Sequence, residues 1–258
     1  MTATTPQAAA GAGAARPRQR VVAQAVFEGT TLLRNGEQLL VSLMLPCLAL
    51  VALAVSSSPS LGPGRRVDLA VPGVLALGVL STAFTGQAIQ TGFDRRYGVL
   101  RLLGVTPLGR RGLLLAKAAA VLTVELLQVI VIGGLGLAFG WHPHWSGIPI
   151  AVLVGLLGTW AWVALALLLA GTLRAEGVLA VANLLWILLL GLGGVIFPRD
   201  QLSGAASTAL AFLPSSALGD GLRAALIDGR FDLTAAAVLL VWGLVATTLA
   251  SRLFRWSD

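Results

Sequence analysis

The chain has 258 residues, of which 57% are hydrophobic and only 11% are charged. An ordinary globular domain carries about 25% charged residues, so too few polar side chains are present here to cover a water-facing surface. This composition excludes a water-soluble protein. In a membrane protein, a net charge of +7 indicates basic loops beside anionic lipid and gives no reason to expect nucleic-acid binding.

The N-terminal region divides into two parts. The first 20 residues are small, polar or basic, and they lack the apolar stretch of a cleavable signal peptide. We therefore expect residues 1–20 to form a disordered cytoplasmic tail. Residues 21–37 mix apolar positions such as Val22 and Val26 with charged ones. This mixture excludes a membrane span and predicts an amphipathic helix lying along the membrane interface.

Apolar runs of span length follow along the rest of the chain, since a helix needs roughly 20 apolar residues to cross a bilayer core. They predict an all-α polytopic membrane protein. Its six transmembrane helices are expected at about 38–56, 69–92, 113–139, 148–172, 178–197 and 233–251.

Basic residues predict the orientation, because they collect in the cytoplasmic segments of membrane proteins. With both termini inside, 13 of the 18 basic residues are cytoplasmic. The five outside are Arg65, Arg66, Arg199, Arg223 and Arg230. This bias favours a multi-pass protein with both ends in the cytoplasm.

Residues 198–232 contain two stretches of modest apolarity, about 201–213 and 217–227, each too short to cross a bilayer. They predict a re-entrant helical hairpin between the fifth and sixth spans. Non-helical backbone at that depth must be buried in protein or face water. Ser215 or Ser216 is expected to cap the second helix, and the Asp228-Gly229 pair is expected to end it.

The segment 93–112 is the most polar internal part of the chain and contains five arginines. A short helix is predicted from Asp94 to Leu103, with Tyr97, Leu100 and Leu103 on one face. Such a cytoplasmic helix beside a span is typical of a docking element.

Thr106 and Pro107 predict the start of the next helix, with Thr106 as N-cap and Pro107 at the first helical position. Arg110 and Arg111 then fall where the helix dipole disfavours cations. Either phosphate groups or an acidic partner stabilise them, or they only fix the topology.

Two stretches carry a family resemblance. The pattern DRRYGVLRLLGVTPLGRRGLLLAK, starting at Asp94, resembles the coupling region of ABC-2-type transporter permeases. The pattern FPRDQLSGAASTALAFLPSSALGDGLRAALIDG, residues 197–229, resembles the re-entrant outer segment of the same family. Within that family, the chain most resembles small actinobacterial-type permeases for drug or lipid export. Two departures are Arg101, where many members carry glutamate, and Ser215-Ser216, which replace an aromatic residue.

The resemblance implies partners. The chain contains no G-x-x-x-x-G-K-[ST] motif for binding nucleotide phosphates. An ABC-2 permease instead works as a homodimer or heterodimer of six-span halves with two separate ATPase subunits, which hold ATP and magnesium. The bacterial cytoplasmic membrane is the implied location. By resemblance, the helix at 94–104 contacts the ATPase, and the coupling residues are Asp94, Arg95, Arg96, Tyr97, Leu100, Arg101, Leu103, Thr106 and Pro107.

Polar residues inside the spans are candidates for the substrate path. Glu125 and Gln128 lie one helical turn apart, and a carboxylate at that depth is costly, so a functional role is the default expectation. Equally, Glu125 can be protonated, or pair with Asn183 or with a cation. Gln87 shares a face with Gln90, where interfacial packing or an inter-helix hydrogen bond is the alternative role. The re-entrant segment adds Phe197 and Pro198 as candidates.

His142 and His144 flank a proline in one short loop. A zinc site needs three or four ligands, and no cysteine is near, so neither a metal site nor a cofactor is expected on this chain.

The sequence thus predicts the permease subunit of an ATP-binding-cassette exporter for an amphipathic or hydrophobic compound, because its spans contain few charges. A non-transporting membrane partner, such as an assembly or immunity protein, stays an alternative. A membrane-embedded enzyme is less favoured, since no Ser-His-Asp, Cys-His or HExxH arrangement occurs.

Overall fold

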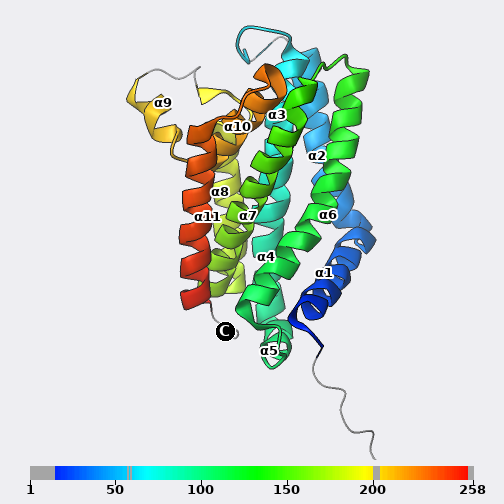
Figure 1. The fold of residues 1–258 in the computed structure, drawn as a ribbon, viewed down its shortest axis with the longest axis vertical. Coiled ribbons are helices and arrows are strands. Elements are labelled where there is room, and N and C mark those ends of the chain that lie inside the picture. Colours follow the sequence, from blue (N-terminus) through cyan, green and yellow to red (C-terminus); the bar gives the residue numbers. More distant parts are fainter. Residues whose placement is uncertain (1–14, 57, 59, 200–203, 255–258) are drawn as a thin grey trace, which may run out of the picture.

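The computed structural model describes residues 15–56, 58, 60–199 and 204–254, and every regular element in them is a helix. Figure 1 shows the longer helices side by side in one bundle, with α5 at one end and α10 at the other. We call these ends the α5 end and the α10 end. The elements are α1 (Pro17–Arg34), α2 (Gly36–Val55), α3 (Arg66–Val79), η1 (Leu80–Gly86), α4 (Gln87–Arg96), α5 (Val99–Gly104), α6 (Gly109–Ala138), η2 (Trp145–Gly147), α7 (Ile148–Thr172), α8 (Ala175–Leu192), α9 (Ala205–Leu210), α10 (Pro214–Asp228) and α11 (Leu233–Leu253).

Among the described residues, five helices are long and apolar enough to cross a membrane. The remaining predicted span, 38–56, corresponds to α2, whose described apolar stretch, Ser42–Val55, is shorter. The chain is therefore an all-helical polytopic membrane protein. The five helices cover Arg66–Arg96, Gly112–Ala138, Trp145–Thr172, Ala175–Leu192 and Leu233–Leu253.

Helix α1 begins earlier than the sequence predicts. It starts at Pro17, which suits a first helical position because proline has no amide hydrogen to leave unpaired. Residues 17–20, predicted to be disordered, are therefore helical, and residues 1–14 of the predicted tail lie outside the described residues. The predicted interfacial helix 21–37 is also interrupted, since α1 ends at Arg34 and α2 follows after one residue.

Helix α1 lies beside α6 in Figure 1, and its two faces differ. On one face, Leu32 packs against Ala120 and Val124 of α6. On the other, Val22 and Val26 are both more than half exposed. Both faces therefore carry apolar side chains, one packed against the bundle and the other exposed.

The second span is one continuous helical rod, longer than the predicted 69–92. Its middle part, η1, is a π-helix, a conformation found mostly as single turns inside α-helices and often at functional sites. The rod continues through α4 to Arg96, so three residues of the predicted coupling helix belong to the span.

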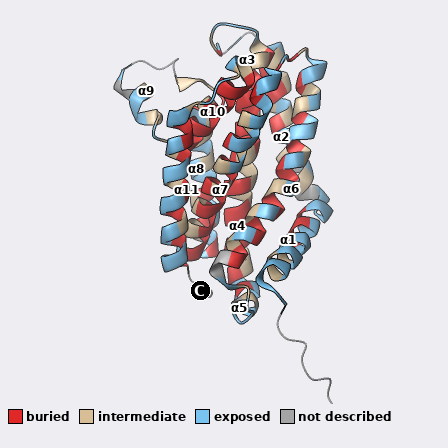
Figure 2. Ribbon diagram, viewed as in Figure 1, coloured by how far each residue is buried: buried red, intermediate tan, exposed pale blue. Residues whose placement is uncertain are grey.

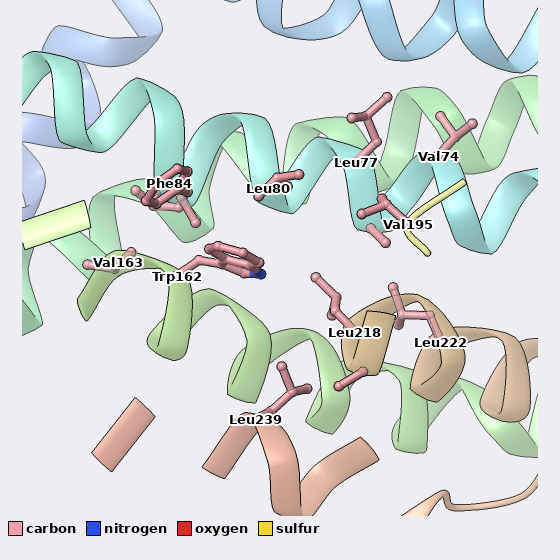
Figure 3. Close-up of a cluster of buried hydrophobic side chains, with 14 of the residues drawn as sticks. Val74, Leu77, Leu80, Phe84, Trp162, Val163, Val195, Leu218, Leu222 and Leu239 are labelled. Carbon is pink, nitrogen blue, oxygen red and sulfur yellow. The ribbon is translucent and has the colours of Figure 1, made fainter. Parts of the chain in front are cut away.

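The core lies between this rod, α7, α10 and α11. Phe84 and Trp162 meet there with their ring centroids 5.3 Å apart, and Figure 3 shows Leu80, Leu218 and Leu239 gathered with them. Figure 2 shows buried positions concentrated in these central helices and exposed positions on outer faces such as that of α11. Apolar exposed faces are suited to contact with lipid.

Close backbone packing at the α10 end depends on Gly147. A Cβ atom at this position would lie 1.8 Å from the Ala225 carbonyl oxygen of α10. We expect Gly147→Ala to lower the free energy of unfolding by about 1–3 kcal/mol, because the backbone has to move apart. Thermal melting in detergent measures this loss. The matched control is Gly134→Ala, whose added Cβ meets nothing within 4 Å, and equal melting of the two variants would contradict the close packing.

The segment between α8 and α11 differs in detail from the predicted hairpin. Helix α8 ends at Leu192, before the predicted end at 197, and part of the first predicted piece, 201–203, lies outside the described residues. Helix α10 begins at Pro214, so neither serine caps it. The expected stop is present, because Gly229 adopts φ +66° directly after Asp228.

Ser215 and Ser216 are instead buried inside the first turn of α10. Their hydroxyl oxygens have no hydrogen-bond partner among the described residues. The cap prediction is wrong because Pro214, which favours the first helical position, starts the helix before them.

Candidate functional site

The predicted coupling segment, 93–112, lies at the α5 end, as Figure 1 shows for α5. The sequence predicts one helix over Asp94–Leu103, and this is wrong. Helix α4 ends at Arg96 and the chain turns at Gly98 before α5 begins. Gly98 has φ +77°, a left-handed conformation that glycine adopts without steric cost. The turn separates a span from a short helix of six residues.

Tyr97, Leu100 and Leu103 also do not lie on one common face, as the sequence predicts they would. Leu100 is fully buried and Leu103 packs against the core, whereas Tyr97 is 73% exposed. Val99 is 41% exposed, and the most exposed apolar side chains at this turn are Tyr97, Leu102 (71%) and Val105 (86%). We call these three residues the α5 surface.

The predicted helix start at Pro107 is wrong by two residues. Helix α6 begins at Gly109, and the Thr106 hydroxyl donates to the Leu103 carbonyl at 2.6 Å. Thr106 therefore caps the end of α5 and not the start of α6. The Pro107 carbonyl accepts a hydrogen bond from Arg20 Nη1 at 2.7 Å, which joins α1 to this loop. The side chains of Arg110 and Arg111 lie outside the described residues.

A buried ion network joins three helices near the α5 end. Lys117 of α6 is fully buried, and its Nζ lies 3.0 Å from Glu28 Oε2 of α1 and 3.4 Å from Asp94 Oδ2 of α4. A buried ammonium needs such partners, because leaving its charge unpaired is very costly. The network fixes α1 and the end of the second span against α6.

The two arginines that follow Asp94 contact the other side of the bundle. Arg95 is buried and donates to the Ala170 carbonyl at 2.7 Å and to the Leu173 carbonyl. These carbonyls belong to the last turn and the C-cap of α7, where helices have unpaired acceptors and favour cations. Arg96 forms an ion pair with Glu176 in the first turn of α8. These contacts fix the end of α4 against α7 and α8, and the turn at Gly98 follows directly after it.

Comparison with known proteins agrees with this architecture. A family model described as ABC-2 family transporter protein matches residues 65–252. The chain belongs to the ABC-2 transporter family. It is a permease component of an ABC transporter, and the family implies association with ABC ATPase subunits. No curated protein matches the chain closely enough to refine this identification.

A cavity of about 580 Å³ in this ABC-2 protein is bordered by α2, the π-helix and α8. Gln87, Gln90 and Asn183 all border it, so the structure brings together two of the predicted substrate-path residues. Gln87 is buried and donates to Thr91 Oγ1 at 3.1 Å, while its Oε1 has no partner among the described residues. The cavity presents hydroxyl and amide groups and no charged side chain among its described walls.

Glu125 and Gln128 border a second cavity and do not meet Asn183. Gln128 Nε2 donates to the Ser42 carbonyl and to Thr82 Oγ1, both at 3.0 Å, so it joins α6 to α2 and to the π-helix. Glu125 accepts from Thr159 of α7. Of the alternatives that the sequence leaves open for Glu125, pairing with Asn183 is excluded by their separate locations.

Phe197 and Pro198 lie half-buried in the non-helical stretch after α8, and neither borders either of the two cavities. Arg223 of α10 holds this stretch by donating to the Gly194 carbonyl at 3.1 Å, to the Val195 carbonyl and to the Ile196 carbonyl at 2.9 Å. Buried carbonyls outside a helix need such donors.

Asp220 supports this arrangement from the same helix. It accepts from Arg199 Nε at 2.6 Å and from Arg223 Nη1 at 3.3 Å. Burial raises the pKa of the Asp220 carboxyl above its ordinary value, while the hydrogen bond from Arg199 and the charge of Arg223 oppose the shift.

Both histidines of the loop contact polar protein groups. His142 Nδ1 lies 2.6 Å from Arg65 Nη1, and His144 Nδ1 lies 2.8 Å from Ser146 Oγ. No group of three or more potential ligands for a metal occurs within the described part of the chain.

Three residues that organise these sites are not among the site residues predicted from the sequence. Glu28, Lys117 and Arg223 are buried and make the contacts described above. Each carries a charge inside an otherwise apolar environment, which is a signal of a buried network. Their partners are not predictable from spacing, since Lys117 and Glu28 are separated by 89 positions.

Proposed function

We propose that this ABC-2 protein is the membrane half of an exporter. Two such chains, identical or different, form the pore, and two separate ATPase subunits bind ATP and magnesium and drive it. The α5 end faces the cytoplasm of a bacterium, where the basic residues of the chain concentrate. The cargo is an amphipathic or hydrophobic compound.

The α5 surface is the observation that carries the proposal. Its three apolar side chains are each more than two-thirds exposed at the tip of the bundle, next to the exposed Arg101. Large apolar side chains beside arginine are typical of protein interfaces. A short helix at this position is suited to fit into a groove of an ATPase.

The way in which α5 is joined to α4 and α6 supports a role in transmitting movement from the ATPase to the spans. On one side it follows α4, whose end is held by Arg95 to α7 and by Asp94 to Lys117. On the other side it leads within a few residues into α6. Coupling between distant sites requires contiguous rigid elements, and this helix is attached to two of them.

The cavity between α2, the π-helix and α8 supports the cargo class. Its polar groups are Ser, Thr, Asn and Gln side chains, with apolar residues such as Leu45 and Val121 between them. Such walls offer hydrogen bonds and apolar contact, and no charged partner, which favours an amphipathic molecule over a strongly ionic one.

Leu102→Asp is expected to reduce binding of the ATPase by about tenfold or more, because apolar anchors at an interface contribute more than 1–2 kcal/mol each. The measurement is co-purification in nanodiscs with the ABC ATPase encoded beside the gene. Leu102 is 71% exposed, so this change does not disturb the core, unlike a change at the buried Leu100.

The matched control is Phe231→Asp, the same kind of change at the α10 end, where Phe231 is 42% exposed. It is expected to leave ATPase binding unchanged. Full retention of the ATPase by Leu102→Asp would exclude the α5 surface as its contact. If neither the native chain nor the control holds an ATPase, the exporter proposal is wrong.

A further inference from the structure

A second cavity, of about 670 Å³, lies between α3, α6 and α7 and shares none of its lining residues with the cavity beside α8. Twelve of its 21 described wall residues are leucine, isoleucine or valine, and the carboxyl and amide side chains among them are Glu125 and Gln128. Glu125 borders it near the middle of α6, and Trp141 and Trp145 border it at the α10 end. The cavity therefore extends from the middle of the membrane toward one surface.

Glu125 is the one acidic residue on the described walls, and it is 7% exposed. The Thr159 hydroxyl lies 2.6 Å from Glu125 Oε2 and 2.9 Å from the Gly155 carbonyl oxygen. Because a hydroxyl has one hydrogen, the carboxyl group receives at most one hydrogen bond from it. Glu125 Oε1 has no partner among the described residues.

This pattern differs from that of the buried Glu28 and the half-buried Asp220. Glu28 pairs with Lys117, and Asp220 pairs with two arginines. For Glu125 no basic partner is recorded in the described part of the chain. A carboxylate deep in a membrane is costly unless a counter-charge accompanies it. The carboxyl group is therefore either neutral while the cavity is empty, or accompanied by a cation from outside the chain.

Two glycines make room for a ligand in this cavity. Gly134 of α6 and Gly155 of α7 both border the cavity, and a Cβ atom built on either would meet nothing within 4 Å. Along the open side, Leu126 and Ile130 are each more than 60% exposed although they border the same space. The cavity thus opens between α6 and α7 on the outer face of the bundle, where lipid is expected.

We propose that this cavity binds a lipophilic amine that enters from the bilayer. Its ammonium group pairs with Glu125, and its apolar body fills the space toward Trp141 and Trp145. A lipid chain or an alcohol fits the apolar walls equally well but leaves the carboxyl group without a counter-charge. An anion is repelled by the Glu125 carboxylate. The site does not depend on the ATPase or on the proposed export.

The test uses dodecylamine with a photoreactive diazirine in its tail, added to the full chain in nanodiscs, with labelled peptides identified by mass spectrometry. We expect labelling of α6 and α7 near the cavity, at concentrations where the matched dodecanol probe labels weakly. Glu125→Gln keeps the side-chain size and is expected to reduce amine labelling by about tenfold or more, since it removes the charge that pairs with the ammonium.

Gly155→Leu gives a second, steric test. Its side chain enters the open space and is expected to abolish labelling, whereas the control Gly191→Leu on α8, also with nothing within 4 Å, is expected to leave it unchanged. The proposal is overturned if the alcohol labels as strongly as the amine, if Glu125→Gln retains full labelling, or if the label maps to the cavity beside α8. Because no ATPase is present, these results are independent of those from co-purification.

Discussion

Lys117→Met is expected to lower the free energy of unfolding by about 3–5 kcal/mol, because it removes the only ammonium that the structure places between two buried or half-buried carboxylates. Glu28 and Asp94 would then face each other without a counter-charge. Methionine has a similar length, so the loss of packing is small. Thermal melting in detergent, followed by circular dichroism, measures the effect.

A triple variant provides the control. Replacing Lys117 with methionine together with Glu28→Gln and Asp94→Asn removes the charges on both sides, and it is expected to recover most of the lost stability. Replacement of a complete buried ion network with neutral groups is often nearly neutral, whereas removal of one partner is not. If Lys117→Met alone melts like the native chain, the three helices do not depend on this network.

Arg223→Ala is expected to destabilise the protein by about 3 kcal/mol or more, since each hydrogen bond from a charged group contributes about 1.5–3 kcal/mol. Three backbone carbonyls between α8 and α9 lose their donor in this variant. Asp220 keeps Arg199 as a partner. The expected result is a lowered melting temperature together with local opening of residues 193–199.

Local opening can be measured separately from global melting. Val195 is 1% exposed, so Val195→Cys in a Cys47→Ala background is expected to react slowly with a membrane-impermeant maleimide and faster once Arg223 is replaced. The control is Arg230→Ala, in which an exposed ion pair with Asp228 is lost and an effect below about 1 kcal/mol is expected. Equal behaviour of the two arginine variants would show that Arg223 does not hold the stretch.

The number and order of the helices are largely predictable from the sequence, because apolar length is a local property. The fourth span is predicted at 148–172, and α7 has these bounds. The errors in the predicted helix boundaries lie mostly where short polar segments join helices. Gly98 ends α4 inside a predicted helix, although a glycine within a helical pattern is itself a signal of a break.

The candidate sites are less predictable, for a physical reason. Gln87 and Asn183 can be selected singly as polar residues in spans, but whether they share a cavity depends on how helices far apart in the chain pack. The same holds for Glu125, whose partner Thr159 is on the next span, 34 positions away. An uncharged threonine in an apolar helix carries no signal of such a contact.

The π-helix in the second span has a geometric consequence. An α-helix advances about 100° per residue, and a π-turn accommodates one extra residue, so the positions beyond it are rotated by about that angle relative to an unbroken α-helix. Gln87, Asp94 and Arg95 all follow the π-helix Leu80–Gly86. A helical wheel drawn through the whole span would therefore assign these three side chains to the wrong neighbours. Relaxation of this turn to α-helical geometry would twist the α5 end of the span about its axis while its other half stays in place.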